Sequence, residues 1–481
     1  MKKILDAALE TAALDGAVYA DARFGCFDTQ VIATRDQMIQ HLSDSTESGL
    51  CVRAYIDGAW GQASGELMTE DAAALLGKRA VEIARLSARI NRRHLELTPL
   101  TSYIAEWRPP VRIDPFSVPL KQKTDLLLEI NGRIRENASV QEAHARMHFK
   151  RSHKLFASTL GSFLDQMQIW SSVDFSAVAV GNGRFVSRDY QGSPRQIGWE
   201  GIEGQPVLEE APRVAREAVE KLTAPEPTEE RIDLILLPSH TRLIIHETIG
   251  HALELDRILG WEADYAGTSF ATREKLGTYR YGSEIFNVTA DRTRDHGMAS
   301  CGYDDDGVPC GRWPMISGGI LMDYAATRDT APLAGFDRSR ACAYADNWSS
   351  FPILRMPNVC IDPGPAGSPS LEQLIADTSN GILVDGMDSY SIDHQRINFQ
   401  FGGDYCRRIR NGRVEEPLYN VTYEGSNPSF WSSVDAICGE SEWRPAGIYG
   451  CAKGQPVQIT ALTHGSSPLR LRNITLRRQA P

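Results

Sequence analysis

The sequence lacks the features of several specialised protein classes. It contains no long basic run, and 51 lysine and arginine residues stand against 62 aspartate and glutamate residues, for a net charge of −11. We therefore do not expect nucleic acid or an anionic membrane surface as a partner. No uncharged apolar stretch approaches the length of about eighteen residues that a membrane-spanning helix needs. The composition, 42% hydrophobic and 23% charged, is typical of a globular protein.

Paired cysteines are also missing. The nine cysteines are an odd number at loose spacing and include no Cys-x-x-Cys pair, which excludes a small disulfide scaffold and a ribbon-type zinc site. Charged residues interrupt the first apolar turn at Lys2, Lys3 and Asp6, a pattern that the apolar core of a signal peptide does not have. We therefore expect a cytoplasmic protein whose cysteines are reduced.

Two proline-rich breaks divide the 481 residues into three segments. The first break covers residues 108–119 and the second covers residues 224–230. Proline fixes φ and has no N–H, so neither stretch continues a helix or a central strand. The predicted domains are an N-terminal domain, residues 1–108, a central α+β region with its linker, residues 109–230, and a C-terminal domain, residues 231–481.

Hydrophobic periodicity predicts both helices and antiparallel strands. We expect helices over about residues 4–12, 70–90, 120–137 and 209–222. Thr69 is placed to cap the second of these, and Asp57-Gly58 and Asn411-Gly412 predict hairpin turns. After about residue 275 the pattern is mostly strand and turn. We therefore predict an α+β fold, with an N-terminal α/β region of antiparallel sheet and helices and a C-terminal, mostly-β domain that has one helix near its start.

That helix follows a buried strand and carries the pattern of a metal site. After residues 232–237 the predicted helix begins near a capping Ser239 and contains His246-Glu247-Thr248-Ile249-Gly250-His251. Histidine nitrogens suit Zn²⁺, and a glutamate beside a ligand can take a proton from metal-bound water. Either histidine alone would more often be an ordinary core residue. Two imidazoles and a carboxylate on an apolar helix, however, are poorly placed unless they are paired or bind a metal.

The spacing of the two histidines predicts a local irregularity in this helix. Residues four apart lie about 40° from each other around an α-helix, whereas residues five apart, such as His246 and His251, lie about 140° from each other. A π-type turn brings residues five apart together, and such turns are frequent at functional sites. Gly250 lies inside the interval and permits the distortion. We therefore expect a π-type turn between the two histidines.

A catalytic zinc needs a third protein ligand and one open position. Glu254 and Asp256 are candidates in the same segment, and His296, His464 and any cysteine are candidates elsewhere. Glu254 lies three residues after His251 on the same helical face, so it is either a ligand or a partner that orients an imidazole. The spacing alone does not choose among these residues.

The sequence resembles the TldD/PmbA family of zinc metalloproteases, and within it the catalytic, metal-binding TldD branch. The segment His246–Asp256 is similar to the family's His-Glu-x-x-x-His signature with its following Leu-Glu-x-Asp. Further family-like segments lie along nearly the whole chain: Tyr19–Arg23, Gly49–Arg53, Asp57–Gly61, Asp304–Pro309 and Gly450–Gln455. Two of them depart from the family pattern, with Asp306 in place of glutamate, and with Ala452 in place of glycine and one residue fewer before Gly454.

The resemblance implies a metallopeptidase with one Zn²⁺ per catalytic subunit. Its third ligand would be Cys451, so that His246, His251 and Cys451 would hold the metal, with Glu247 as general base and metal-bound water as nucleophile. The expected substrates are unfolded or leader peptides, bound in an extended conformation. No substrate-binding residue is assigned, although Ala299–Gly307 is a candidate for a cavity-lining strand or loop and equally for a solvated acidic turn.

The resemblance also implies a dimer, formed either by two like subunits or with a metal-free PmbA/TldE-like paralogue. An alternative function is that of the non-catalytic peptide-binding subunit of such a pair, which the complete histidine motif disfavours. A third possibility is metal-assisted hydrolysis of an amide bond in a small molecule, because a fold class does not fix the substrate. The sequence specifies neither the physiological substrate nor the cleavage site, and it does not distinguish endo- from exopeptidase action.

Overall fold

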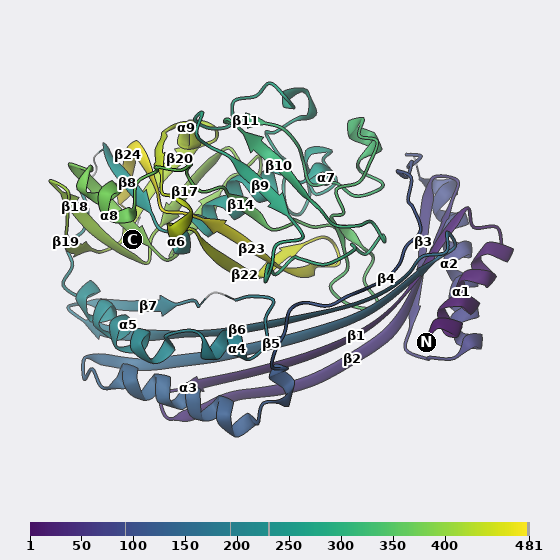
Figure 1. Ribbon diagram of the computed structural model, residues 1–481, viewed down its shortest axis with the longest axis horizontal. Coiled ribbons are helices and arrows are strands. Elements are labelled where there is room, and N and C mark those ends of the chain that lie inside the picture. Colours follow the sequence, from purple (N-terminus) through teal and green to yellow (C-terminus); the bar gives the residue numbers. More distant parts are fainter. Residues whose placement is uncertain (92, 193, 229–230, 479–481) are drawn as a thin grey trace.

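The computed structural model describes residues 1–481 except residues 92, 193, 229–230 and 479–481. A long curved sheet, built from the N-terminal part of the chain, carries a C-terminal body along one of its faces (Figure 1). Helices occur together with antiparallel and mixed sheets, which confirms the predicted α+β fold. No described helix combines the length and the apolar character that crossing a lipid bilayer requires.

The N-terminal sheet has seven strands in the order β3-β2-β1-β5-β6-β4, with β7 also paired to β6. Its strands are β1 (Tyr19–Arg35), β2 (Met38–Ile56), β3 (Ala59–Gly65), β4 (Ile104–Trp107), β5 (Val140–Ser158), β6 (Phe163–Gly181) and β7 (Arg184–Tyr190). The central strands β1 and β5 pair antiparallel from Asp21↔Ser158 to Arg35↔His144. The first two predicted segments therefore contribute to one sheet, while the boundaries at residues 108 and 230 stay predictions.

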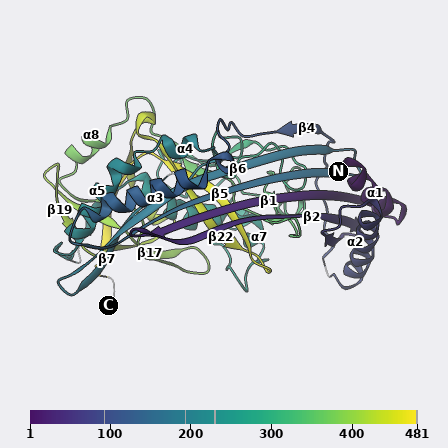
Figure 2. The same ribbon diagram turned by 90° about the horizontal axis from the view of Figure 1, so that it is seen from below.

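All four predicted helices are present, with ends that differ by up to two residues. α1 (Lys2–Leu14) and α2 (Glu70–Ile90) pack at one end of the sheet. At the other end, α3 (Leu120–Arg135) and α5 (Val207–Lys221) cover the face turned away from the C-terminal body (Figures 1 and 2). α2 begins as predicted, because the Thr69 hydroxyl accepts a hydrogen bond from the third residue of the helix at 3.2 Å.

The C-terminal body is mostly β, as predicted. Its main sheet has nine strands in the order β16-β17-β20-β24-β8-β15-β18-β19, with β21 paired to β24. These strands are β8 (Arg231–Leu236), β15 (Asn380–Asp385), β16 (Tyr390–Ile392), β17 (Asn398–Gly402), β18 (Tyr405–Arg410), β19 (Arg413–Leu418), β20 (Val421–Ser426), β21 (Val434–Ile437) and β24 (Leu469–Arg478). The predicted hairpin between β18 and β19 turns at Asn411 and Gly412, whose φ values of 48° and 75° are the left-handed pair of a tight turn.

Smaller sheets complete the body and surround its core. They comprise β9 (Val288–Asp291), β10 (Arg312–Ser317), β11 (Ile320–Leu321), β12 (Ala343–Tyr344), β13 (Ile353–Leu354), β14 (Val359–Ile361), β22 (Arg444–Lys453) and β23 (Gln458–Ser466). Short helices lie between the strands of this body: α7 (Leu255–Ile258), α8 (Leu371–Ala376) and α9 (Ser429–Ser432), whereas α4 (Glu200–Glu203) precedes α5 beside the N-terminal sheet. The largest apolar core of the molecule packs β8 and β24 against the helix that follows β8. That helix carries the histidine motif, so the motif lies inside the core.

The contact of α2 with β3 depends on a glycine. A Cβ added to Gly61 would lie 2.1 Å from the Ala80 carbonyl oxygen and 2.2 Å from the Ala84 nitrogen, both in α2. Any side chain at this position therefore pushes the helix off the sheet.

We predict that Gly61→Ala lowers the free energy of unfolding by about 1–3 kcal/mol, measured by urea denaturation, because the added methyl group overpacks the contact. Gly311→Ala is the matched control, since a Cβ at Gly311 meets no atom within 4 Å. A Gly61→Ala variant as stable as the control would contradict the close packing of α2 on β3.

Candidate metal centre

The histidine motif follows directly from α6 (Pro238–Ile245), which leads from the buried strand β8 into the core. Pro238 occupies the first turn of α6, where its fixed φ and missing N–H are tolerated. The prediction that Ser239 caps this helix is wrong, because α6 already begins at Pro238 and the Ser239 hydroxyl donates a hydrogen bond to Asp385. The last residues of α6 are fully apolar and buried, which anchors the motif that follows.

A π-helical turn over His246–Gly250 confirms the predicted irregularity. The His251 N–H donates to the His246 carbonyl oxygen, which is the i+5 hydrogen bond of a π turn. The two imidazole rings consequently lie together, with centroids 4.5 Å apart and planes at 75°. Gly250 has an ordinary helical φ of −55°, and it is required for space: a Cβ there would lie 2.2 Å from Met356 Sδ.

Three possible metal-ligand atoms meet at this turn. One nitrogen each of His246 and His251 and the Sγ of Cys451 all lie within 4.8 Å of one another, and all three residues are buried. Cys451 lies in β22, and its Sγ is 3.5 Å from His251 Nε2. Among the described residues, no second group of three His, Cys, Asp or Glu side chains comes together in this way. The predicted ligand set is therefore assembled by the fold from segments 200 residues apart in the sequence.

His464 stands behind His246 and sets its tautomer. His464 Nδ1 lies 2.8 Å from the Val359 carbonyl oxygen, so this nitrogen is the donor. Burial, with the neighbouring His246, holds the pKa of His464 well below its usual value, so its Nε2 is an acceptor. The His246 Nδ1–H donates to it at 2.9 Å. The remaining lone pair of His246 is then on Nε2, the atom available to a metal.

Glu254 performs the same task for His251. His251 Nδ1 donates to Glu254 Oε2 at 2.8 Å, which leaves the lone pair on Nε2, the nitrogen that faces Cys451. Lys453 Nζ lies 3.2 Å from Glu254 Oε1 and 2.8 Å from Asp256 Oδ1. Of the alternative third ligands, Glu254 therefore lies behind His251, and Asp256 binds Lys453. His296 bonds the Gln196 carbonyl oxygen at 3.1 Å and does not join the group.

The Cys451 thiol lies beside a buried cation. Arg355 donates to the Cys451 sulfur at 3.1 Å and to its carbonyl oxygen at 2.6 Å. Burial alone would raise the pKa of the Cys451 thiol, but His251 and Arg355 outweigh burial and lower this pKa below its ordinary value. The side chain is thereby held toward the thiolate form that binds metals. No motif in the sequence marks Arg355.

Glu247 is buried beside the histidines and forms an ion pair with Arg396. Arg396 comes from the turn between β16 and β17, where its φ is 63°, and its second terminal nitrogen donates to the Ala266 carbonyl oxygen at 3.2 Å. The pair fixes the direction of the Glu247 carboxylate. Arg396 carries no sequence signal, because it reaches the motif from a hairpin about 150 residues away.

A cleft of about 640 Å³ opens onto the ligand atoms between the long sheet and the C-terminal body. Its walls include His246, Glu247 and Cys451 on one side and residues of β1, β5 and β6 on the other. Burial raises the pKa of Asp174 and of Asp189, both in the walls, to about 6. β22 pairs with β23 and with no other strand within the described part of the chain.

The acidic segment Ala299–Gly307 is a buried connection and does not form a solvated turn. Lys154 of β5 bonds Asp305 Oδ2 at 2.7 Å, and Arg53 of β2 bonds Asp306 Oδ1 at 2.8 Å. The segment therefore ties the N-terminal sheet to the C-terminal body. It contributes to other cavities than the cleft at the ligand atoms.

The donor set fits a zinc ion. Two imidazole nitrogens whose lone pairs are available to a metal and one thiolate are borderline and soft ligands, which Zn²⁺ prefers. Three protein ligands leave a fourth coordination position open. Each ligand has a partner behind it: His464 for His246, Glu254 for His251, and Arg355 for Cys451. Such partners orient ligands and raise metal affinity.

Models of one protein family match most of the chain. The PmbA/TldA metallopeptidase domain 1 matches residues 28–84, the central domain of this family matches residues 113–224, and its C-terminal domain matches residues 229–475.

Relatives named metalloprotease are similar over nearly the whole length. A metalloprotease of Methanothermobacter thermautotrophicus is 27% identical over 462 residues, which cover 95% of both chains. A metalloprotease TldD homolog of Haemophilus influenzae is 23% identical over 474 residues, which cover 95% of this chain and 92% of that one.

Solved structures share the fold at low identity. A Thermotoga maritima protein described as a candidate modulator of a DNA gyrase has a TM-score of 0.79 at 13% identity and covers 99% of this chain and 100% of its own. TldE from Thermococcus kodakarensis has a TM-score of 0.74 at 14% identity, and the match covers 98% of this chain and 99% of TldE. At these identities the likeness concerns the fold.

The His464 hydrogen bond generates a prediction for metal affinity. His464→Phe keeps a ring in place but removes the acceptor of the His246 Nδ1–H, so we expect zinc affinity to fall about 10–100-fold. Competition with a chromophoric chelator measures the zinc affinity. His41→Phe, at an exposed histidine of β2, is the control. Unchanged affinity in the His464 variant would show that this hydrogen bond does not support the ligand.

The Arg355 contact generates a prediction for pH dependence. Since this cation lowers the pKa of the Cys451 thiol, Arg355→Met should raise that pKa, and protons should then compete better with the metal. Zinc affinity of the variant, relative to the unsubstituted protein, should fall more at pH 6.5 than at pH 8.5. An equal loss at both pH values would mean that Arg355 acts by packing alone.

Proposed function

The chain belongs to the PmbA/TldA metallopeptidase family, and we propose that it is a zinc-dependent peptidase that hydrolyses peptide bonds of unfolded or leader peptides. One observation carries this proposal: two histidines of a π turn and a distant cysteine bring their ligand atoms within 4.8 Å of one another at the edge of a cleft. The names of the relatives support a metallopeptidase, and the donor set supports zinc as the metal.

His246, His251 and Cys451 would hold the zinc ion. When bound, Zn²⁺ supplies a Lewis acid that activates water and polarises a carbonyl group. The chain's own contribution is to present two neutral imidazoles through their Nε2 atoms and one thiol whose pKa is lowered. Both imidazoles can therefore bind a metal without a change of tautomer.

Glu247 would move the proton. Its carboxylate lies next to the first histidine and lines the cleft, where it can accept a proton from water and deliver it to the leaving amine nitrogen. Arg396 acts as a positioning residue, since its ion pair fixes the direction of the carboxylate. The buried surroundings strengthen the ion pair between Glu247 and Arg396.

The substrate would lie as an extended strand in the cleft. The edge of β22 that has no strand partner in the described part of the chain would offer backbone groups next to Cys451, and pairing through backbone hydrogen bonds selects little for sequence. This favours unfolded peptides over folded proteins. We extend the proposal to a cytoplasmic dimer, with either a like subunit or a metal-free paralogue.

A non-catalytic peptide-binding subunit is the alternative. Retention of His246, Glu247, His251 and Cys451 in one buried group disfavours it, because a subunit that only binds peptide needs none of them. A mixed peptide library, read by mass spectrometry with and without a co-expressed paralogue, tests activity, substrate and partner together. Cleavage that requires added zinc supports the proposal, and the absence of cleavage in both samples rejects it.

Glu247→Gln separates metal binding from proton transfer. We expect the variant to keep its zinc and to lose peptide cleavage by about 10²–10⁴-fold, because the amide cannot take the proton. Zinc content and kcat are both measured. Glu416→Gln, at a carboxylate distant from the cleft in β19, is the control. Normal turnover in the Glu247 variant would reject its role as base.

Cys451→Ser tests the third ligand. The hydroxyl is a poorer zinc ligand than a thiolate, so we expect the variant to lose zinc on dialysis at a chelator concentration that the unsubstituted protein withstands. Cys438→Ser, at another buried cysteine, controls for loss of a core thiol. Equal zinc stoichiometry in the Cys451 variant and the control would remove Cys451 from the ligand set.

A further inference from the structure

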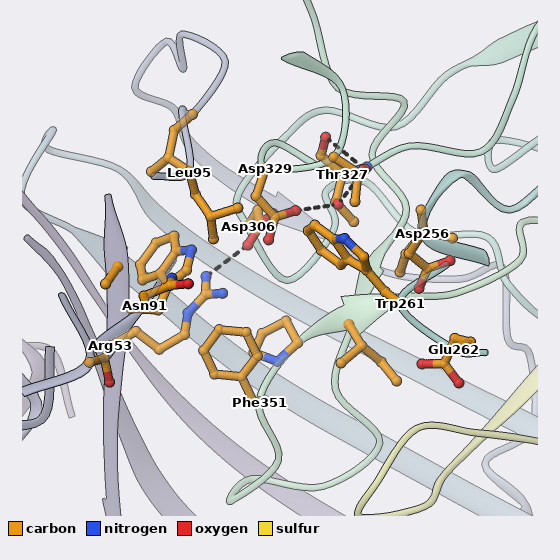
Figure 3. A pocket seen from close by; sticks show the side chains of 18 of the residues that line it. Arg53, Asn91, Leu95, Asp256, Trp261, Glu262, Asp306, Thr327, Asp329 and Phe351 are labelled. Atoms are coloured by element: carbon orange, nitrogen blue, oxygen red, sulfur yellow. Dashed lines mark hydrogen bonds and ion pairs between the residues drawn. The ribbon is translucent and has the colours of Figure 1, made fainter. Parts of the chain in front are cut away.

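A second cavity of about 640 Å³ lies between the end of α2, strand β3 and the segment that follows the histidine motif (Figure 3). It shares no lining residue with the cleft at the metal-ligand atoms. The proposed peptidase chemistry makes no use of it. Its volume is within the range of pockets that hold small organic ligands.

The walls of this cavity are aromatic. Phe351 lines one side and Trp261 another (Figure 3), and Trp60 and several aliphatic residues also belong to the lining. The rings already hold one cation, since the Arg53 guanidinium lies 4.6 Å from the Trp60 ring centroid and 5.4 Å from that of Phe351. Aromatic faces attract cations, and desolvation strengthens the attraction.

The cavity has more carboxylates than cations. Arg53 is the one cation in its described lining, and Asp21 and Asp306 bind it at 2.6 Å and 2.8 Å. Asp329 and Glu262 also face the cavity (Figure 3). The structure gives Asp329 a hydrogen bond from the Thr327 hydroxyl and gives neither carboxylate an ion-pair partner among the described residues.

Glu262 shows the excess of carboxylates over cations most clearly. Its Oε2 atom is buried and has no hydrogen-bond partner in the described part of the chain. Burial raises the pKa of Glu262 and of Asp329, and nearby cations (Lys453 and Arg257 for Glu262, Arg53 for Asp329) lower it only in part, so a cost of burying these carboxylates remains. A cationic ligand would remove that cost while its apolar part covered the aromatic walls.

We propose that this second cavity binds an organic cation, with one ammonium or guanidinium group joined to an aromatic or aliphatic body. The cation lies against Asp329 and Glu262, and the body lies among Trp60, Trp261 and Phe351. The ligand is either a free amine or the amino terminus of a peptide, because the two present the same group.

Isothermal titration with tryptamine, tryptophol and indole-3-propionate tests the charge requirement on one ring. We expect tryptamine to bind at least about tenfold more tightly than tryptophol, and indole-3-propionate to bind least. Asp329→Asn combined with Glu262→Gln should remove the preference for tryptamine and leave tryptophol binding unchanged. Glu129→Gln with Glu209→Gln, two exposed carboxylates of α3 and α5, is the charge-matched control.

Trp-Gly-Gly amide with a free or an acetylated amino terminus separates the two sources. Binding of tryptamine alone identifies a free amine, and binding of the free-terminus peptide at similar affinity identifies a peptide amino terminus. Equal affinities for tryptamine and tryptophol would overturn the proposal. Tryptamine binding that survives in the double variant would also overturn it, because the cation would then bind elsewhere.

A separate observation concerns Cys301 and Cys310, which lie on either side of Asp304–Asp306 in the sequence. Cys301 Sγ lies 3.4 Å from Cys310 Sγ, and Arg292 donates to the Cys301 sulfur at 3.1 Å. The backbone holds the two ends together, since the Cys310 N–H donates to the Gly302 carbonyl oxygen at 2.9 Å. The hydrogen bond from Cys310, together with Arg292, lowers the pKa of Cys301 to about 6.

We infer that Cys301 and Cys310 are a reversible oxidation site that responds to hydrogen peroxide. The Cys301 thiolate attacks one peroxide oxygen, the O–O bond breaks, and water leaves once the released hydroxide is protonated. Cys310 then attacks the sulfenic sulfur, the S–O bond breaks, and a second water leaves as the disulfide forms. The two sulfurs lose two electrons in total and the peroxide gains them. The disulfide closes the segment whose Asp305 and Asp306 bind the N-terminal sheet.

Trypsin provides a direct readout, because cleavage after Arg294 and Arg312 places both cysteines in one peptide. After treatment of the zinc-loaded protein with peroxide, we expect this peptide to lose about 2 Da and to regain it with dithiothreitol. Cys310→Ser should stop at a sulfenic acid that dimedone traps. Cys301→Ser should leave Cys310 unreacted, and Cys360→Ser should behave as the unsubstituted protein. An unchanged peptide mass, or equal oxidation of Cys310 in the Cys301 variant, would overturn the inference.

Discussion

The candidate metal centre depends on the hydrogen bond and the ion pair of one buried carboxylate, that of Glu254. This carboxylate accepts the His251 Nδ1–H at 2.8 Å and lies 3.2 Å from Lys453 Nζ. His251 belongs to the motif, whereas Lys453 is in β22 two residues after Cys451, so this carboxylate joins the two parts of the chain that supply ligands. Burial alone would raise the pKa of Glu254, but Lys453 and His251 outweigh it and hold the pKa well below its usual value. A buried charge is tolerated here because Oε2 accepts the hydrogen bond of His251 and Oε1 lies in an ion pair with Lys453.

Local patterns predicted the fold class and the helices because caps, turns and helical periodicity depend on neighbouring residues. The cap at Thr69 and the hairpin at Asn411-Gly412 are of this kind. Pairing of β1 with β5 is different, because more than 100 residues separate Asp21 from Ser158 and no local pattern encodes their register. The cap expected at Ser239 failed for a tertiary reason, since Asp385 from another strand takes that hydroxyl.

The candidate site likewise has features that local sequence predicted and features that depend on distant segments. The five-residue spacing of His246 and His251 predicted the π turn because both residues belong to one turn of one helix. His464 was among the candidate ligands, but its role follows from a hydrogen bond to a strand far away in the sequence, which assigns its tautomer. Arg355 and Arg396 reach the site from segments without a motif, so only the three-dimensional structure identifies them. The family resemblance supplied Cys451, which composition and spacing left open among nine cysteines.

The central claim is that this cysteine, 200 residues after its histidine partner, completes a zinc site. X-ray absorption spectroscopy at the zinc edge of the metal-loaded protein tests it most directly, because sulfur and nitrogen ligands give separate shells. We predict two imidazole nitrogens at about 2.0–2.1 Å and one sulfur at about 2.3 Å. A first shell of nitrogen and oxygen without sulfur would contradict the claim.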